Sequence, residues 1–226
     1  MARKIITLSY DDAVKQDRRL VEILNRYGLK ATFNLNSGLL GTENFLTIDG
    51  RRVAHDKIER AELASLYRGH EVAAHTLTHP HLTSLLDGEI VRQVEGDRLA
   101  LSEIVGYEVV GMAYPGGGFQ NSDRVERQIR EHTGIKYART ISLSYSFDKT
   151  PNLFRYKPTA FHLDFATNYQ LFDEFLATEK DAIFYIWGHS YELDTHDTWA
   201  ELEKFFAHIS NREGVEYLTN KQAFFG

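Results

Sequence analysis

The chain has no cysteine among its 226 residues. This absence excludes disulfide bonds, thiolate metal ligands and a cysteine nucleophile. Any transition-metal site in this protein must therefore be built from histidine, aspartate or glutamate.

Long apolar runs are also missing. No stretch approaches the roughly 18 residues that a membrane-spanning helix needs. The first residues, MARKIITLSYDD, enter a strand pattern at once, without the charged and apolar segments of a signal peptide. We therefore expect a soluble, cytoplasmic protein with no membrane partner.

Positive charge is scattered, and the formal net charge is -6. Because phosphate binding needs clustered lysine and arginine, we expect no nucleic-acid partner. The longest local excess of positive charge is interrupted by acidic residues, and we interpret it as a solvated face. It consists of Arg51, Arg52, Lys57 and Arg60. The sequence does not indicate an oligomeric state.

Short β-rich runs alternate with helical stretches from end to end. Hydrophobic periodicity predicts strands at 4–10, 31–35, 71–74, 111–114, 137–140, 182–187 and 215–218, and helices near 20–27, 57–67, 87–105, 122–132, 168–179 and 198–210. Only residues 141–165, with two of the four prolines, show no clear period. About seven such units predict parallel strands with right-handed crossovers, in a single α/β barrel domain spanning residues 1–226.

Reactive side chains follow the first and third predicted strands. Asp11 and Asp12 are adjacent carboxylates that repel each other, so a nearby cation would hold them together, although such a pair alone is more often a turn or helix cap. His75 and His79 have a spacing that places both imidazoles on one face of a helical turn. Two histidines and a carboxylate form a common open metal site. His81 is an alternative ligand in the same loop.

Two further clusters follow the fourth strand and the strand at 182–187. Tyr114 and Pro115 lead into three glycines beginning with Gly116, where backbone N–H groups can bind a developing oxyanion; a plain turn explains these glycines equally well. His189 is in position for acid–base catalysis, although a lone histidine is more often structural. All four clusters occur at the C-terminal ends of predicted strands, and this shared placement favours an active site.

Four segments, in order along the chain, resemble the motifs of one family. They are SYDDA (9–13), HTLTH (75–79), MAYPGG (112–117) and IWGH (186–189). The first is similar to a strand ending in Thr-Phe-Asp-Asp-Gly, the second matches His-(Ser/Thr)-x-x-His, and the last is an apolar pair closing on a histidine. These are the motifs of the polysaccharide deacetylase family, also called carbohydrate esterase family four, and the resemblance covers nearly the whole chain.

The resemblance implies a distorted (β/α)7 barrel that binds one divalent metal ion, with Zn²⁺ as the default and Co²⁺, Mn²⁺, Ni²⁺ or Fe²⁺ as alternatives. The family's roles can be carried over by position. They assign Asp12, His75 and His79 as metal ligands, Asp11 as the general base, His189 as the general acid, and the Gly116 N–H as part of an oxyanion hole, with Tyr114 and Pro115 in the same motif.

The chain departs from the family at several positions. Ala13 replaces the usual glycine after the aspartate pair, Ala113 stands where many members carry an arginine that steadies the base, and Gly116 falls where an aromatic is common. The fourth motif, an Asp and Trp pair, is not recognisable. Arg139, at the end of a predicted strand, is our candidate for the missing positive charge; the alternative is a surface arginine.

We therefore expect a metal-dependent hydrolase that removes N-acetyl groups from an amino sugar or oligosaccharide, releasing free amine and acetate. Two alternatives stay open: hydrolysis of a small cyclic amide or ureide on the same fold, and a non-catalytic carbohydrate-binding barrel. Trp187, Tyr191 and Phe119 are candidates for stacking on a sugar ring, or else core aromatics.

Overall fold

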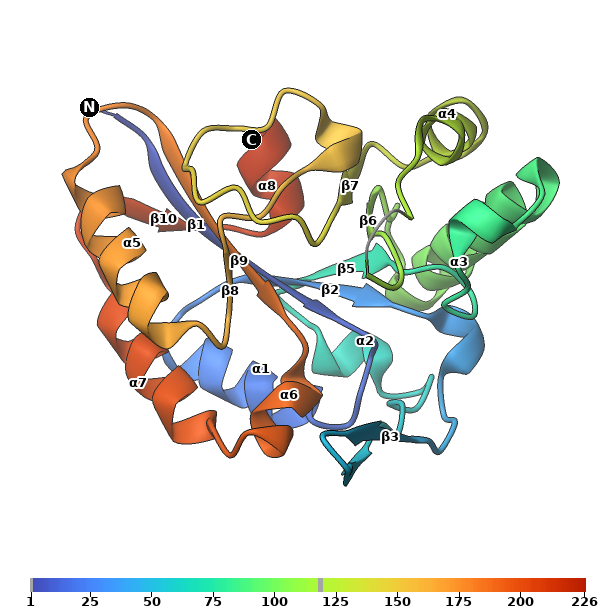
Figure 1. Cartoon of the computed structure of the whole chain (residues 1–226), viewed down its shortest axis with the longest axis horizontal. Helices are drawn as coiled ribbons and strands as arrows, with labels where there is room; N and C mark the ends of the chain where they lie inside the picture. The colour runs from blue at the N-terminus through green and yellow to red at the C-terminus, as the bar shows by residue number, and fades with distance from the viewer. Residues whose placement is uncertain (1, 118–119) are drawn as a thin grey trace.

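Strand β1 (Lys4–Asp11) lies in the middle of a parallel sheet and is buried along nearly its whole length (Figure 1). The structure is a computed structural model that describes residues 2–117 and 120–226. Strand β9 (Ala182–Gly188) pairs with β1 along one side. On the other side, β10 (Val215–Tyr217) pairs with the first half of β1 and β2 (Ala31–Leu35) with the second half.

The strand order confirms the predicted α/β barrel fold. It runs β7-β6-β5-β2-β1-β9-β8, with β10 beside β1, and the ladders between these strands are parallel. The sheet curls, and among the described residues no ladder joins its two end strands, β7 and β8. It therefore forms a half-barrel that is not closed by hydrogen bonds. The remaining strands are β5 (Glu71–Ala74), β6 (Gly111–Ala113), β7 (Tyr137–Arg139) and β8 (Ala160–Phe161).

Amphipathic helices cover the outside of the sheet. In Figure 1, α1, α5 and α7 lie together on one side, and α3 and α4 lie at the opposite end. The longest helix ends where Gly106 adopts a left-handed conformation, which glycine does without a steric penalty. None of the helices in the described part of the chain is long and apolar enough to cross a membrane. The helices on the sheet are α1 (Asp17–Arg26), α3 (Asp87–Val105), α4 (Asp123–His132), α5 (Phe165–Ala177) and α7 (Trp199–Ile209).

The sequence prediction was wrong between residues 40 and 67. A hairpin of β3 (Phe45–Ile48) and β4 (Arg51–Ala54) precedes the segment predicted as a helix at 57–67, of which only α2 (Leu63–Leu66) is helical. The reason is that the backbone before α2 bonds to distant loops instead of to itself. The N–H of Lys57 donates to the Thr42 carbonyl at 2.9 Å, and that of Ile58 to the Ala13 carbonyl at 2.9 Å.

Other short elements also lie outside the prediction. Helix α6 (Ser190–Thr195) begins directly after β9, and α8 (Asn220–Phe225) closes the chain. Single 3₁₀ turns occur at Ser37–Leu39, Leu82–Ser84 and Leu153–Arg155. The prediction that four positive charges form a solvated face was wrong for Lys57. Its side chain is buried, whereas Arg51, Arg52 and Arg60 are exposed as expected.

Candidate active site

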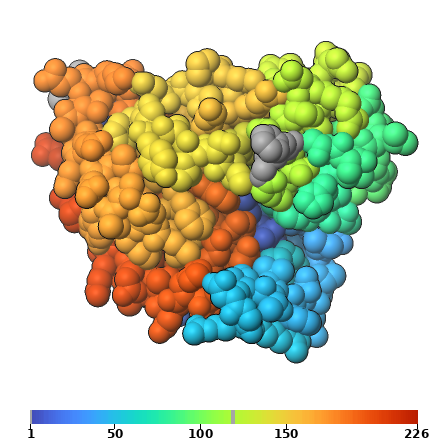
Figure 2. Space-filling view, in the orientation of Figure 1, coloured from blue at the N-terminus to red at the C-terminus, as the bar shows by residue number. Residues whose placement is uncertain are grey.

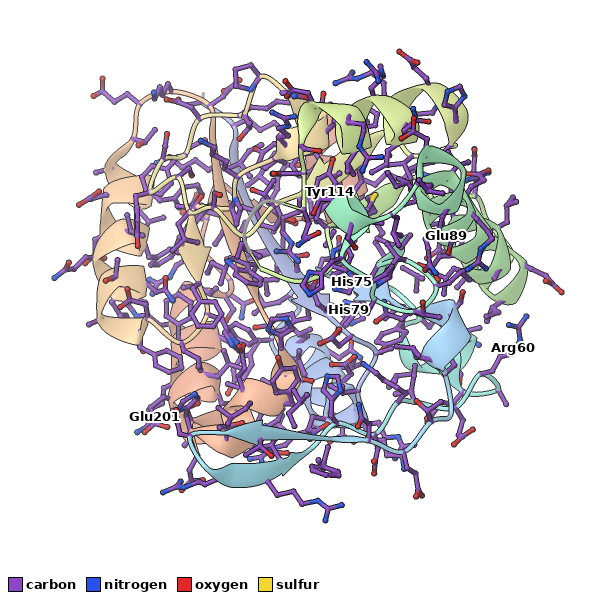
Figure 3. All side chains as sticks on the ribbon, turned by 45° about the vertical axis from the view of Figure 1, so that its right-hand side comes forward. Arg60, His75, His79, Glu89, Tyr114 and Glu201 are labelled. Atoms are coloured by element: carbon purple, nitrogen blue, oxygen red, sulfur yellow. The ribbon has the colours of Figure 1, made fainter. Side chains whose placement is uncertain are left out.

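The C-terminal ends of the strands open into a cavity of about 530 Å³. Figure 2 shows it as a hollow in which the deep-blue N-terminal segment is visible between the orange, green and cyan parts of the chain. In Figure 3, His75 and His79 lie side by side toward the middle of the molecule, while Arg60, Glu89 and Glu201 lie at its margins. The cavity lining includes all four clusters noted in the sequence: Asp11 and Asp12, His75 and His79, Tyr114 and Gly116, and His189.

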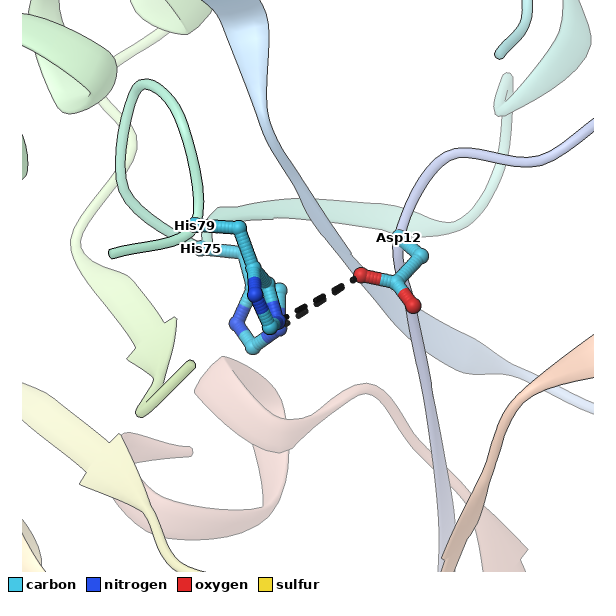
Figure 4. Close-up of side chains that lie close together, drawn as sticks. All are labelled: Asp12, His75 and His79. Carbon is cyan, nitrogen blue, oxygen red and sulfur yellow. Dashed lines mark ion pairs between the residues drawn. The ribbon is translucent and has the colours of Figure 1, made fainter. Parts of the chain in front are cut away.

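Asp12, His75 and His79 form a group that could hold a metal ion (Figure 4). The Oδ1 atom of Asp12 lies 3.8 Å from Nε2 of His75 and 3.7 Å from Nε2 of His79. Ligand atoms about 2.1 Å from one ion in tetrahedral geometry lie about 3.4 Å apart. A contraction of a few tenths of an ångström would bring each histidine nitrogen to that spacing from the carboxylate. All three ligand atoms lie within 4.8 Å of one another, so these residues fit a divalent metal.

The protonation of both imidazoles suits metal binding. Nδ1 of His75 lies 2.9 Å from the Ala113 carbonyl, which can only accept, so Nδ1 carries the hydrogen and Nε2 presents a lone pair toward Asp12. Burial lowers the pKa of His75, and it lowers that of His79 to about 4. Both rings are therefore neutral at pH 7, as metal ligands must be.

His81, the alternative ligand, lies apart from this group. The Gln120 side-chain amide donates to its Nδ1 at 2.8 Å. The N–H of Gly116 approaches the metal group instead and donates to Nε2 of His79 at 3.3 Å, a hydrogen bond that a metal on Nε2 would replace and so release the N–H for another acceptor. Gly116 has a positive φ of 70°, a conformation that glycine adopts without strain.

Asp11 is buried beside the metal group and is held by two donors. Arg139 forms an ion pair with Oδ2, and the Asn34 amide donates to Oδ1 at 2.8 Å. The side chains of Arg139 and Asp11 are 0% and 2% exposed. Burial acts to raise the pKa of Asp11, but positive charges, Arg139 foremost, outweigh it and lower that pKa. Asp11 is therefore a carboxylate at neutral pH.

His189 faces the two aspartates from the end of β9. Its Nε2 lies 3.9 Å from Oδ2 of Asp11 and 4.0 Å from Oδ2 of Asp12. On the other side of the ring, Nδ1 lies 3.1 Å from Oε1 of Glu192. Burial acts to lower the pKa of His189, but the hydrogen bond and charge of Glu192 and the charges of the aspartates outweigh it and raise the pKa to about 9. The ring is therefore an imidazolium at neutral pH.

Glu192 is held in place by other groups. It accepts a hydrogen bond from the backbone N–H of His189 at 2.9 Å and one from Nε2 of His162 at 2.8 Å. These two histidines lower the pKa of Glu192 against the effect of burial. The carboxylate is therefore fixed in both position and charge, and it holds the imidazole of His189 toward the cavity.

The rest of the tyrosine–proline–glycine segment serves the barrel more than the cavity. The Tyr114 hydroxyl donates to the Phe154 carbonyl at 2.9 Å, and the Tyr114 N–H donates to the Arg139 carbonyl at 3.0 Å. Pro115 is buried. Gly118, the last of the three glycines, and Phe119, the third candidate for sugar stacking, lie outside the described residues.

The two aromatic candidates for sugar stacking, Trp187 and Tyr191, both line the cavity. They are 8% and 9% exposed, so each also belongs to the packed interior. The Trp187 ring lies 4.5 Å below the guanidinium carbon of Arg139, and Tyr191 packs edge-on against His55. Only a small part of each ring therefore remains for a ligand.

Sequence reasoning missed four polar residues around this site: Asn34, His55, Lys57 and Glu192. Glu192 had a usable signal, because it follows His189 by three residues, a spacing that lets side chains meet on a helix. Asn34 lies at the end of β2, where reactive groups were expected. His55 and Lys57 follow neither a predicted strand nor another site residue at helical spacing, because they lie just after the hairpin, which was not predicted.

The chain matches the sequence family described as Polysaccharide deacetylase over residues 1–138. The carbohydrate esterase family 4 domain of a xylanase from the hindgut metagenome of Trinervitermes trinervoides has a similar structure, with a TM-score of 0.61 and 20% identity, covering 98% of this chain and 90% of that one. A mutant of a family 4 pseudoenzyme from Bacillus anthracis, with restored enzymatic activity, gives 0.62 at 18% identity, covering 98% and 67%.

A family 4 carbohydrate esterase from Streptomyces lividans, solved with acetate, gives a TM-score of 0.56 at 16% identity, covering 95% of this chain and 92% of that one. At these identities the similarity establishes the fold alone. No curated protein matches the sequence significantly.

Proposed function

Because the chain belongs to the polysaccharide deacetylase family, we propose that it is a metal-dependent hydrolase that removes N-acetyl groups from an amino sugar or oligosaccharide. One observation carries this proposal. A group that could hold a metal, Asp12, His75 and His79, lies in a cavity beside an ionised Asp11 and a protonated His189. A barrel that only bound carbohydrate would need neither a base nor an acid at this place.

A divalent metal held by Asp12, His75 and His79 would supply a Lewis acid that activates water and polarises the amide carbonyl. The His₂Asp donor set suits Zn²⁺, with Co²⁺, Mn²⁺, Ni²⁺ and Fe²⁺ as alternatives.

Asp11 takes the proton of the attacking water, and Arg139 and Asn34 keep its carboxylate ionised and oriented for that transfer. The water oxygen bonds to the carbonyl carbon, and the C–N bond then breaks. His189 donates the proton on Nε2 to the departing nitrogen, and the Gly116 N–H is near enough to the metal group to stabilise charge on the carbonyl oxygen. The products are acetate and a free amine.

The size of the cavity supports a small substrate or a single sugar unit of a longer chain. About 530 Å³ lies within the range of small-molecule sites. Trp187 and Tyr191 line it, and aromatic side chains of this kind offer apolar surface to a sugar ring.

The proposal can be tested by acetate release. The protein would be stripped with a chelator, reloaded separately with Zn²⁺, Co²⁺, Mn²⁺ and Ni²⁺, and incubated with N-acetylglucosamine, chitooligosaccharides and small cyclic amides. We expect metal-dependent release of acetate from at least one N-acetylated sugar. Ring opening of a cyclic amide without any acetate release would favour the alternative substrate class, and inactivity on every substrate with every metal would refute the proposed hydrolase.

A further inference from the structure

The segment that follows the β3–β4 hairpin lies directly against the loop that carries Asp12. Val14 and Lys57 form an antiparallel bridge. The N–H of Lys15 donates to the Asp56 carbonyl at 2.8 Å, and that of Ile58 donates to the Ala13 carbonyl at 2.9 Å. The exit of the hairpin, which lies at the lower right of Figure 1, is thus joined by backbone hydrogen bonds to the loop that carries the candidate metal ligand.

That loop needs support, because its backbone is strained. Asp12 has a φ of 85° and Ala13 a φ of 55°. Residues with a side chain enter this region at a cost of about 1–3 kcal/mol each, and they stay there only where surrounding contacts hold them.

Lys57 supplies one such contact to the main chain. Its ammonium group donates to the Asp12 carbonyl at 2.7 Å, and its side chain is 3% exposed. A buried ammonium group has no water to bond to, so breaking this hydrogen bond would leave the charge without a hydrogen-bond partner at a high cost in free energy.

His55 supplies the contact to the side chain. Its Nε2 lies 3.2 Å from Oδ2 of Asp12, and because a carboxylate only accepts, Nε2 carries the hydrogen. The other oxygen, Oδ1, is the one that faces His75 and His79. His55 therefore hydrogen-bonds to Oδ2 and not to Oδ1, the oxygen that faces the two histidines and lies 3.9 Å from the Lys57 ammonium nitrogen.

We propose that His55 is a positioning residue for the metal site, which fixes the Asp12 carboxylate through Oδ2 while Lys57 fixes its backbone. This inference rests on the proposed function, since it assumes that Asp12, His75 and His79 bind a metal. The hydrogen bonds that orient metal ligands typically contribute about 10–100-fold to metal affinity. The hairpin is then part of the metal site, although it supplies no ligand.

The test measures the dissociation constant for Zn²⁺ by competition with a chromogenic chelator, on the whole chain. We expect His55→Ala to raise this constant about 10–100-fold. His55→Gln places an amide N–H donor near the position of Nε2 and should bring the constant back toward the wild-type value. His70→Ala is the matched control, because His70 is 7% exposed against 8% for His55 and its Nδ1 accepts from the Ala31 N–H, away from Asp12. It should leave the constant unchanged.

The outcomes separate the two proposals. If wild-type protein binds Zn²⁺ and His55→Ala binds it equally well, the role of His55 is refuted and the deacetylase proposal stands. If His55→Gln binds as weakly as His55→Ala, the hydrogen bond is not the cause and the inference is again overturned. If the wild-type protein binds neither Zn²⁺ nor the Co²⁺, Mn²⁺ and Ni²⁺ of the acetate-release test, both proposals fail together. Thermal unfolding of each metal-free variant shows whether it remains folded.

Discussion

Replacing Arg139 by methionine should destabilise the protein strongly, because it leaves the Asp11 carboxylate buried without its partner. Neither side chain has access to solvent that could replace the lost interaction, at 0% and 2% exposure. Removing one member of a buried ion pair costs about 3–5 kcal/mol, a large share of the roughly 5–15 kcal/mol by which a domain is stable. Asn34 would remain as a donor to Asp11.

Urea unfolding at pH 7 measures this loss as a lower midpoint with an unchanged slope. The matched control is Arg92→Met, since Arg92 pairs with Glu89 on the surface of α3 with side chains 61% and 35% exposed. Surface pairs of this kind contribute about 0–1 kcal/mol. The double variant Asp11→Asn/Arg139→Met has no buried carboxylate left unpaired and should be more stable than Arg139→Met alone.

The reasoning is refuted if Arg139→Met is no less stable than Arg92→Met. It is also refuted if the double variant loses the full sum of the two single losses, because contacting residues of one ion pair must show a coupling free energy. In the second case the loss from Arg139→Met would be independent of Asp11, and stacking on Trp187 would be the main contribution of Arg139.

Four further predictions concern the site and its surroundings. Asp11→Asn should retain one bound metal and lose about 10²–10⁴-fold in turnover; full activity would remove Asp11 from its role as base. His79→Ala should abolish tight metal binding, measured by chelator competition, and His81→Ala should not, since His81 bonds to a glutamine side chain away from the group. His189→Ala should slow hydrolysis of an acetamide far more than that of an activated aryl acetate, whose leaving group departs without a proton; equal slowing of both would mark His189 as structural. Burial raises the pKa of Asp17 to about 7, so the folded protein keeps a proton that the unfolded chain loses near pH 4, and stability falls as pH rises from about 4 to about 7. Asp17→Asn should remove this part of the decline, measured as urea midpoints across that range, and parallel curves for variant and wild type would contradict it.

The accuracy of the fold prediction followed the strength of the local pattern. Helix α3 was predicted with its observed bounds because an apolar stripe repeats at helical spacing and Gly106 then ends it. The segment at 57–67 has similar apolar residues, but its first part is extended and bonds to Thr42 and Ala13. Contacts between residues so far apart in sequence leave no periodic trace, so local reasoning could not find them.

The same distinction applies to the candidate site. Asp12, His75 and His79 follow predicted strands, and the rule that polar residues gather at the C-terminal ends of barrel strands grouped them with Asp11, His81 and His189. The family resemblance then singled out these three as the metal ligands. His55 reaches the same carboxylate from a hairpin that no strand pattern announced, across 43 positions of sequence. Its neighbour Lys57 resembled a surface charge, because burial of a lysine depends on partners that only the folded chain brings together.

The position of Arg139 has a specific structural explanation. In the parallel ladder between β6 and β7, the register partner of Arg139 is Ala113, the residue that stands where many family members carry an arginine. Register partners in neighbouring parallel strands point to the same face of a sheet. A guanidinium at 139 therefore begins one strand farther along the sheet from β1, and its long side chain still reaches the Asp11 carboxylate. An arginine at both positions would place two guanidinium groups at one carboxylate inside a buried space, so the alanine at 113 and the arginine at 139 are best understood as a matched pair.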